Sequence, residues 1–156
     1  MRRHPALVTA IAIGSCTVLS VSACGTAGTQ VRPTNPTGQV AVTCQAFRAA
    51  LPSTIAGQTA RPVLPPSPYT AAWGKPPVTS RCGVETPMGL EPTSQLFTID
   101  GIDWFPATGT DATTFTTIGR VASIEVSVPK SLAPEASVLT DFSDAVKKSN
   151  PLTPSR

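Results

Sequence analysis

The side chains that most often carry catalysis are scarce in this chain. Its one histidine, His4, lies within the first 23 residues, so the rest of the chain holds no imidazole for a Ser-His or Cys-His mechanism. Ser127 and Lys130 match the Ser-x-x-Lys pattern of penicillin-binding proteins. That motif begins a helix and works with Ser-Asp-Asn and Lys-Thr-Gly partners, whereas here it ends a predicted strand and the partners are missing. We therefore expect no catalytic residue and no enzymatic activity.

Asp100 and Asp103 flank a predicted turn and could be imagined as an acid pair or a metal-binding pair. Turn chemistry explains Asp100, because an aspartate side chain bonds readily to nearby backbone groups. Asp103 alternates outward beside Trp104 in the predicted hairpin. We therefore expect no metal site.

Cys24 is the residue whose surroundings indicate a definite chemistry. Val21-Ser22-Ala23-Cys24 resembles the bacterial lipoprotein box. Ahead of it, Arg2 and Arg3 followed by an apolar run over residues 6–22 are typical of an export signal, and the run is too short and interrupted for a permanent membrane span. The resemblance implies that residues 1–23 are cleaved and that diacylglycerol is attached to the Cys24 sulfur. The expected site is the outer face of the cytoplasmic membrane, with no cofactor besides this covalent lipid.

Two alternatives to lipidated Cys24 stay open. Ile13-Gly14-Ser15-Cys16 also fits a loose lipoprotein box, but it would leave only about eight apolar residues for the signal. The chain could also be an ordinary secreted protein that is cut near residue 23. The length requirement of the signal favours Cys24.

Charge and composition indicate one small exported domain. The chain carries 12 Lys plus Arg and 9 Asp plus Glu, so without Arg2 and Arg3 it is nearly neutral. No basic patch predicts nucleic-acid binding. Residues 24–39 are rich in Gly, Thr, Pro, Asn and Gln and are expected to form a flexible tether spanning about 20 Å. We expect one domain over residues 40–149 and a short tail over residues 150–156.

Cys44 and Cys82 are the thiols that remain once Cys16 is removed and Cys24 is acylated. In an oxidising compartment a disulfide between them is the simplest expectation. It would connect the first helix to the sheet. The alternative is two separate buried thiols.

The pattern of apolar residues predicts a helix, about four strands and a second helix. The first helix begins at Thr43, which can cap it, and is stopped by Pro52. The prolines of residues 53–77 exclude regular helix and central strand, and this segment is expected to wrap the surface with Val63, Leu64 and Tyr69 tucked inward. A strand is expected over residues 78–84.

A β-hairpin over residues 94–105 is the clearest local signal. Asp100-Gly101 suits a type I′ turn, which pairs Ile99 with Ile102 and Phe97 with Trp104 and makes Trp104 a core residue. Strands are also expected over residues 113–118 and 121–128, joined at Gly119-Arg120. Pro134 is expected to open the last helix, whose apolar stripe comprises Val138, Leu139, Phe142, Ala145 and Val146.

These elements predict an α+β fold with a small, mainly antiparallel sheet. The N-terminal and C-terminal helices cover one face of the sheet, and the disulfide joins helix to sheet.

Trp73, Lys75 and Arg81 form the candidate recognition surface. A tryptophan on a proline-stiffened loop offers a rigid contact, and Arg81 could bind an anionic or carboxylate partner. In the alternative interpretation Trp73 plugs the end of the core and Arg81 stays solvated.

Several sequence blocks together resemble an actinobacterial family of unknown function, DUF3515. They are Cys44 with Leu51-Pro52, residues 71–78 (AAWGKPPV), residues 81–84 (RCGV), residues 101–104 (GIDW), Gly119-Arg120 and residues 126–129 (VSVP). The resemblance implies a secreted protein or lipoprotein of the cell envelope. We expect a non-catalytic interaction or accessory module whose partner is an envelope protein or a cell-wall component. A carrier of a small lipid or peptidoglycan fragment is the alternative.

Overall fold

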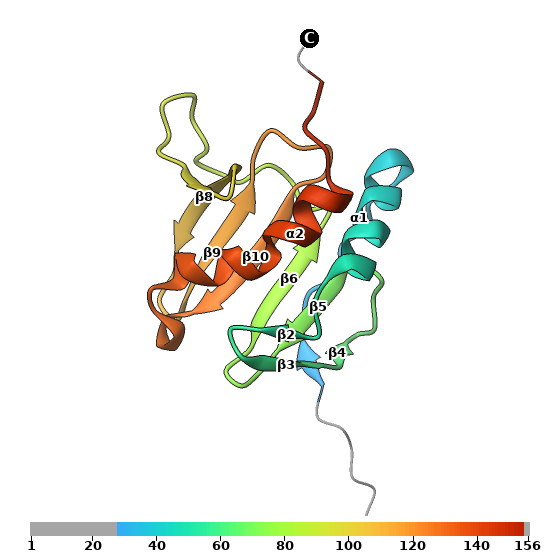
Figure 1. The fold of residues 1–156 in the computed structure, drawn as a ribbon, viewed down its shortest axis with the longest axis vertical. Coiled ribbons are helices and arrows are strands. Elements are labelled where there is room, and N and C mark those ends of the chain that lie inside the picture. The colour runs from blue at the N-terminus through green and yellow to red at the C-terminus, as the bar shows by residue number, and fades with distance from the viewer. Residues whose placement is uncertain (1–27, 155–156) are drawn as a thin grey trace, which may run out of the picture.

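The computed structural model describes residues 28–154 and confirms a disulfide-linked α+β domain with a mostly antiparallel sheet (Figure 1). The sheet has eight strands in the order β2-β3-β5-β6-β10-β9-β8-β7. Their bounds are Thr54–Ile55 (β2), Gln58–Arg61 (β3), Thr70–Trp73 (β5), Val78–Cys82 (β6), Phe97–Ile99 (β7), Ile102–Thr108 (β8), Ala112–Thr117 (β9) and Ile124–Pro129 (β10). Two short strands, β1 (Thr29–Gln30) and β4 (Val63–Leu64), pair in parallel beside it.

Two helices lie on one face of this sheet, as predicted (Figure 1). They are α1 (Gly38–Ala50) and α2 (Thr140–Ser149). Their buried residues join the inward side chains of the strands in a single core, which includes Phe47, Trp73, Trp104, Val126 and Phe142. We call the other side of the sheet its open face.

The expected count of about four strands is wrong, because residues 53–77 hold strands that the prolines concealed. Pro62 lies between β3 and β4, and Pro76 and Pro77 lie in the turn between β5 and β6. None of them stands where a central strand needs a backbone donor. Of the side chains expected inside, Val63 and Tyr69 are half-buried and Leu64 is exposed.

The hairpin prediction is confirmed in register and in turn type. Ile99 pairs with Ile102 and Phe97 with Trp104, while Asp100 and Gly101 have φ of 50° and 76°. Positive φ at both central positions defines the type I′ turn, whose twist matches that of the strands it joins. Trp104 is fully buried.

Both helices differ from prediction at their N-termini. α1 begins at Gly38, so Thr43 is buried inside the helix and does not cap it. Pro134 is followed by a 3₁₀-helix, Glu135–Leu139, and α2 begins only at Thr140. A second 3₁₀ turn, Lys130–Leu132, precedes it. The predicted apolar stripe from Val138 to Val146 is buried.

The chain ahead of α1 packs against the sheet, which corrects the tether expected as far as residue 39. Thr29 N donates to Pro62 O at 2.8 Å, and Val31 N donates to Leu64 O at 3.0 Å. Val31 is buried, and the buried Thr34 hydroxyl donates to the carbonyl of Cys82. The predicted signal, with His4 and Cys16, and the predicted lipid site at Cys24 lie outside the described residues.

The C-terminal residues also belong to the folded body, beyond the boundary expected at residue 149. Asn150 is fully buried. Val121 N donates to Pro151 O at 3.0 Å, and Thr153 N donates to Gly119 O at 2.9 Å. These bonds fasten the segment after α2 to the β9–β10 loop.

Candidate functional site

Trp73 is a core residue, so its part in the predicted recognition surface is wrong. The side chain is 1% exposed. Its Nε1–H donates to Pro52 O at 3.1 Å, and its ring meets Phe142 edge-on with 5.5 Å between centroids. A ring enclosed in this way cannot contact a partner. It closes the core between β5 and α2.

Lys75 and Arg81 lie at opposite ends of β6 and do not form one surface. Lys75 is exposed in the β5–β6 turn, where its backbone N–H donates to Gln58 Oε1 at 3.0 Å. Arg81 lies near the far end of the strand. Because side chains alternate along a strand, and Cys82 faces α1, Arg81 projects from the open face.

Arg81 lies in a polar groove on that face, which we call the outer groove. Its volume is about 770 Å³, and its walls come from the segment after β1, from β6 and the loop that follows it, and from β10. It is lined by Arg32, Pro33, Thr34, Asn35, Arg81, Gly83, Val84, Glu85, Met88 and Glu125. The outer groove therefore carries two guanidinium groups and two carboxylates.

An ion pair between Arg81 and Glu125 crosses this groove. The two residues are direct neighbours on β6 and β10, with Arg81 Nη1 3.0 Å from Glu125 Oε1 and side chains 26% and 24% exposed. A pair exposed to this extent contributes up to about 1 kcal/mol to stability. Arg81 donates to Glu125 from Nη1, and a guanidinium has five N–H donors. Its Nε is buried, so the donors that a partner can reach are those on the two Nη atoms. Arg81 thus keeps donors for a further acceptor.

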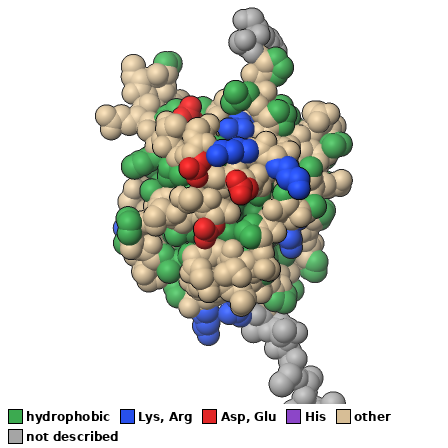
Figure 2. All heavy atoms as spheres, viewed as in Figure 1, with side chains coloured by type: hydrophobic (Ala, Val, Ile, Leu, Met, Phe, Trp, Pro, Cys, Tyr) green, Lys and Arg blue, Asp and Glu red, His purple; other side chains and the backbone are tan. Residues whose placement is uncertain are grey.

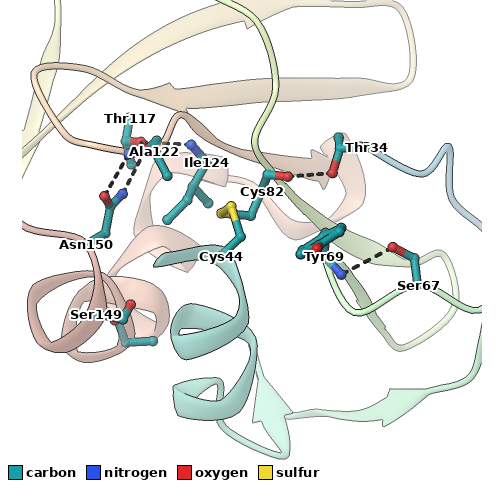
Figure 3. The surroundings of a disulfide bond; sticks show 11 residues. Thr34, Cys44, Ser67, Tyr69, Cys82, Thr117, Ala122, Ile124, Ser149 and Asn150 are labelled. Atoms are coloured by element: carbon teal, nitrogen blue, oxygen red, sulfur yellow. Dashed lines mark hydrogen bonds between the residues drawn. A yellow bond between two sulfur atoms is a disulfide. The ribbon is translucent and has the colours of Figure 1, made fainter. Parts of the chain in front are cut away.

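The residues that follow Arg81 build one wall of the groove, and Figure 3 shows the contacts of the first of them, Cys82, with Cys44 and Thr34. Cys82 is bonded to Cys44 of α1, with 5.4 Å between the Cα atoms, which confirms the predicted disulfide. Its carbonyl accepts from Thr34 on the opposite side. Gly83 has φ of 78°, and a Cβ there would lie 2.6 Å from Pro36. A glycine is therefore required where residues 34–36 cross β6.

Arg120 has a structural role, because its guanidinium bonds to two segments that are distant in the sequence. Its Nη1 donates to Asn150 O at 2.7 Å and its Nη2 to Gly101 O at 3.3 Å. Burial lowers the pKa of Arg120, and Asp103 opposes that shift. Arginine titrates so far above neutrality that the group stays charged in the physiological range. Arg120 thus joins the hairpin turn to the C-terminal segment.

The other candidate pairs considered from the sequence do not assemble into reactive sites. Asp100 occupies the turn, and Asp103 Oδ1 accepts from the Thr98 hydroxyl at 2.6 Å. Ser127 pairs with Thr79 and Thr114 on the sheet, whereas Lys130 lies in the 3₁₀ turn that follows β10. Within residues 28–154, no group of three or more His, Cys, Asp or Glu side chains could hold a metal ion. Nor is any helix in that range long and apolar enough to cross a membrane.

These features define the class of protein. It is a small disulfide-linked α+β domain with a polar groove on the open face of its sheet. The family model described as "Protein of unknown function (DUF3515)" matches residues 5–154. The chain belongs to this family, as its sequence blocks indicated. No curated protein and no solved structure matches the chain.

The sequence pointed to Arg81 but not to the residues around it. Glu125 alternates outward on a predicted strand, and that strand had to be placed beside β6 before the ion pair could be foreseen. Arg32 and Asn35 stood in the segment expected to be a tether. Glu85 lies in the loop after β6, where no periodicity marks it.

Proposed function

We propose that this protein is an exported, lipid-anchored and non-catalytic binding module whose partner docks in the outer groove. The lipoprotein box at Cys24 supports the anchor and a place on the outer face of the cytoplasmic membrane. The observation that carries the binding role is the half-buried Arg81–Glu125 pair, in which Arg81 donates to Glu125 from Nη1 and keeps further N–H donors on its Nη atoms. A carboxylate on an envelope protein or a cell-wall component would accept from this guanidinium.

The arrangement suits recognition better than chemistry. The outer groove offers charged donors and acceptors in fixed positions. The pairing of β6 with β10 and the Cys44–Cys82 disulfide hold these positions. Partner and lipid anchor then act together, because anchoring keeps the module near envelope components.

Crosslinking in intact cells followed by mass spectrometry of the captured proteins tests this function. We expect the wild-type chain to capture a consistent set, and Cys24→Ala and Arg81→Ala to lose it. Lys147→Ala is the matched control, because it removes the same charge from an exposed position on α2, on the opposite side of the sheet. Equal capture by Arg81→Ala and Lys147→Ala would refute docking in the outer groove.

A second groove on the helix side favours the alternative role of a small-ligand carrier. It has a volume of about 430 Å³ and is lined by Phe97, Pro106, Thr108, Thr113, Phe115, Lys130, Pro134, Glu135 and Ala136. Phe97 is 48% exposed and its ring meets Phe115 edge-on. Native mass spectrometry that finds a lipid or peptidoglycan fragment bound to the wild type but not to Phe97→Ser would support this role. Finding no bound species would count against it.

A further inference from the structure

We propose that one end of the domain rests on anionic lipid headgroups, with Lys75 in contact with them. We call it the anchor end and define it by β1, residues 63–66 and residues 74–77. The inference rests on the proposed lipid at Cys24. It adds an orientation and a second, lipid partner to that function.

The length of chain before the first described residue carries the argument. From Thr29 onward the backbone is hydrogen-bonded to Pro62 and Leu64. Only four Cα–Cα steps separate Cys24 from Gly28, and a fully extended chain covers at most about 14 Å in that interval. A headgroup layer is itself about 5 to 8 Å thick. A lipid on Cys24 therefore holds the start of β1 close to the headgroups.

The other elements at the anchor end then face the bilayer together with the start of β1. Figure 1 shows the described chain beginning in blue beside β4, at the same end of the molecule as the β5–β6 turn and the β2–β3 hairpin. The C-terminal segment leaves from the opposite end. Anchoring thus selects one end of the domain.

The surface chemistry of the anchor end suits a lipid interface. Lys75 is exposed, and the turn that carries it is held by the bond from its N–H to Gln58 Oε1 and by Gly74, which packs on the Gln58 side chain. Leu64 is 38% exposed beside Pro65 and Pro66. A lysine on a small apolar surface matches a layer of phosphates above acyl chains.

On the face of the molecule that is turned to the viewer, the charged side chains of the anchor end are basic. Figure 2 shows Lys or Arg side chains at the lower end and no acidic side chain beside them. In α2, the Asp141 carboxylate accepts from Ala56 N in the β2–β3 turn at 2.7 Å. This carboxylate is thereby engaged by the protein backbone.

The orientation leaves the outer groove open to a partner. Arg81 follows Val78 by three residues along β6, which is about 10 Å of strand. It therefore lies farther from the bilayer than Lys75. One strand carries the lipid contact at its start and the partner contact near its end.

Lysine reactivity in vesicles tests the orientation, because the chain contains four lysines, Lys75, Lys130, Lys147 and Lys148. The full chain is produced in a bacterium that lipidates exported proteins, and the intact mass reports whether Cys24 carries lipid. The lipidated protein is placed in vesicles of phosphatidylglycerol and phosphatidylcholine, in vesicles of phosphatidylcholine alone, and in detergent. A water-soluble acetylating reagent then measures the labelling rate of each lysine.

We expect Lys75 to be labelled about fivefold more slowly in the phosphatidylglycerol vesicles than in detergent, while Lys147 on α2 is unchanged. Stronger protection of Lys75 in the phosphatidylglycerol vesicles than in the vesicles of phosphatidylcholine alone supports contact with anionic headgroups. Equal labelling of Lys75 in vesicles and detergent, on protein whose mass shows the lipid, would overturn the proposal. A chain that carries no lipid on Cys24 would instead overturn the proposed function.

A length variant separates tethering from simple attraction. Inserting fifteen Gly and Ser residues between Gly25 and Thr26 lengthens the connection ahead of the described residues. The longer connection should restore the labelling of Lys75 to its rate in detergent, because the domain can then leave the surface. Continued protection of Lys75 in this variant would contradict the short-tether argument.

Discussion

The side-chain amide of Asn150 forms hydrogen bonds with both the backbone N–H and the backbone C=O of Ala122. The Asn150 Oδ1 accepts from Ala122 N at 2.9 Å, and its Nδ2 donates to Ala122 O at 2.7 Å (Figure 3). The side-chain amide therefore replaces a strand partner for the β9–β10 loop. Because Asn150 also ends α2, this contact fixes the last helix to the sheet.

Asn150→Ala should lower the free energy of unfolding by about 2 to 4 kcal/mol, because it leaves the buried N–H and C=O of Ala122 without this partner. Denaturant unfolding with the disulfide intact measures the change. Asn35→Ala is the control, since Asn35 is exposed, and it should change stability by less than about 0.5 kcal/mol. Equal midpoints for the two variants would contradict the role assigned to Asn150.

Local chemistry explains the parts of the fold that could be predicted. The Asp100-Gly101 turn fixes the register of its hairpin within a few residues, and the spacing from Val138 to Val146 marks a helix face without reference to the sheet. Cys44 and Cys82 could be paired because the predicted removal of Cys16 and acylation of Cys24 leave no other thiols, and the predicted compartment is oxidising. Each of these inferences needs only neighbouring residues or a count.

The rest depends on contacts between distant segments. β5 is short and lies among prolines, and its strand character comes from pairing with both β3 and β6. Asn150 looks like the start of a tail until its partner Ala122 is placed. The proline-stiffened loop suggests Trp73 as a contact residue, and the sequence places the charged Arg81 only eight residues away. Strand alternation and the sheet order decide that one faces solvent and the other the core.

Trp73→Ala should lower the free energy of unfolding by about 3 to 5 kcal/mol, as expected for a large ring removed from a core. Trp73→Phe should cost less, because it keeps most of the contact with Phe142. Lys75→Ala, two residues away and exposed, is the control and should leave the melting temperature nearly unchanged. A Trp73→Ala variant as stable as wild type would contradict the buried position of the ring.

The disulfide should resist reduction until the domain unfolds. Cys44 and Cys82 are both fully buried, so a reductant reaches the sulfur atoms slowly in the native state. Once broken, the bond no longer closes a loop with a sequence separation of 38 residues, and the chain-entropy model gives a loss of about 4 kcal/mol. Thiol titration with and without denaturant follows the reaction. Two thiols released at once from the native protein would contradict the burial.

Gly83→Ala should destabilise the domain more than Gly89→Ala. Both glycines have positive φ, but a Cβ at Gly83 would meet Pro36 at 2.6 Å, whereas a Cβ at Gly89 meets nothing within 4 Å. The left-handed backbone alone costs an alanine about 1 to 2 kcal/mol, and forcing Pro36 aside adds about 1 to 3 kcal/mol. Unfolding of the two variants in denaturant measures the difference.

The displaced segment also forms one wall of the outer groove, so the same substitution reports on binding. If Pro36 moves, Arg32 and Asn35 move with it, and Gly83→Ala should weaken capture of the partner while the protein is still folded. Gly89→Ala lies in the same loop and should keep that capture. Loss of stability without loss of capture would show that the partner does not depend on residues 32–36 and contacts the groove through β6, the loop that follows it, and β10.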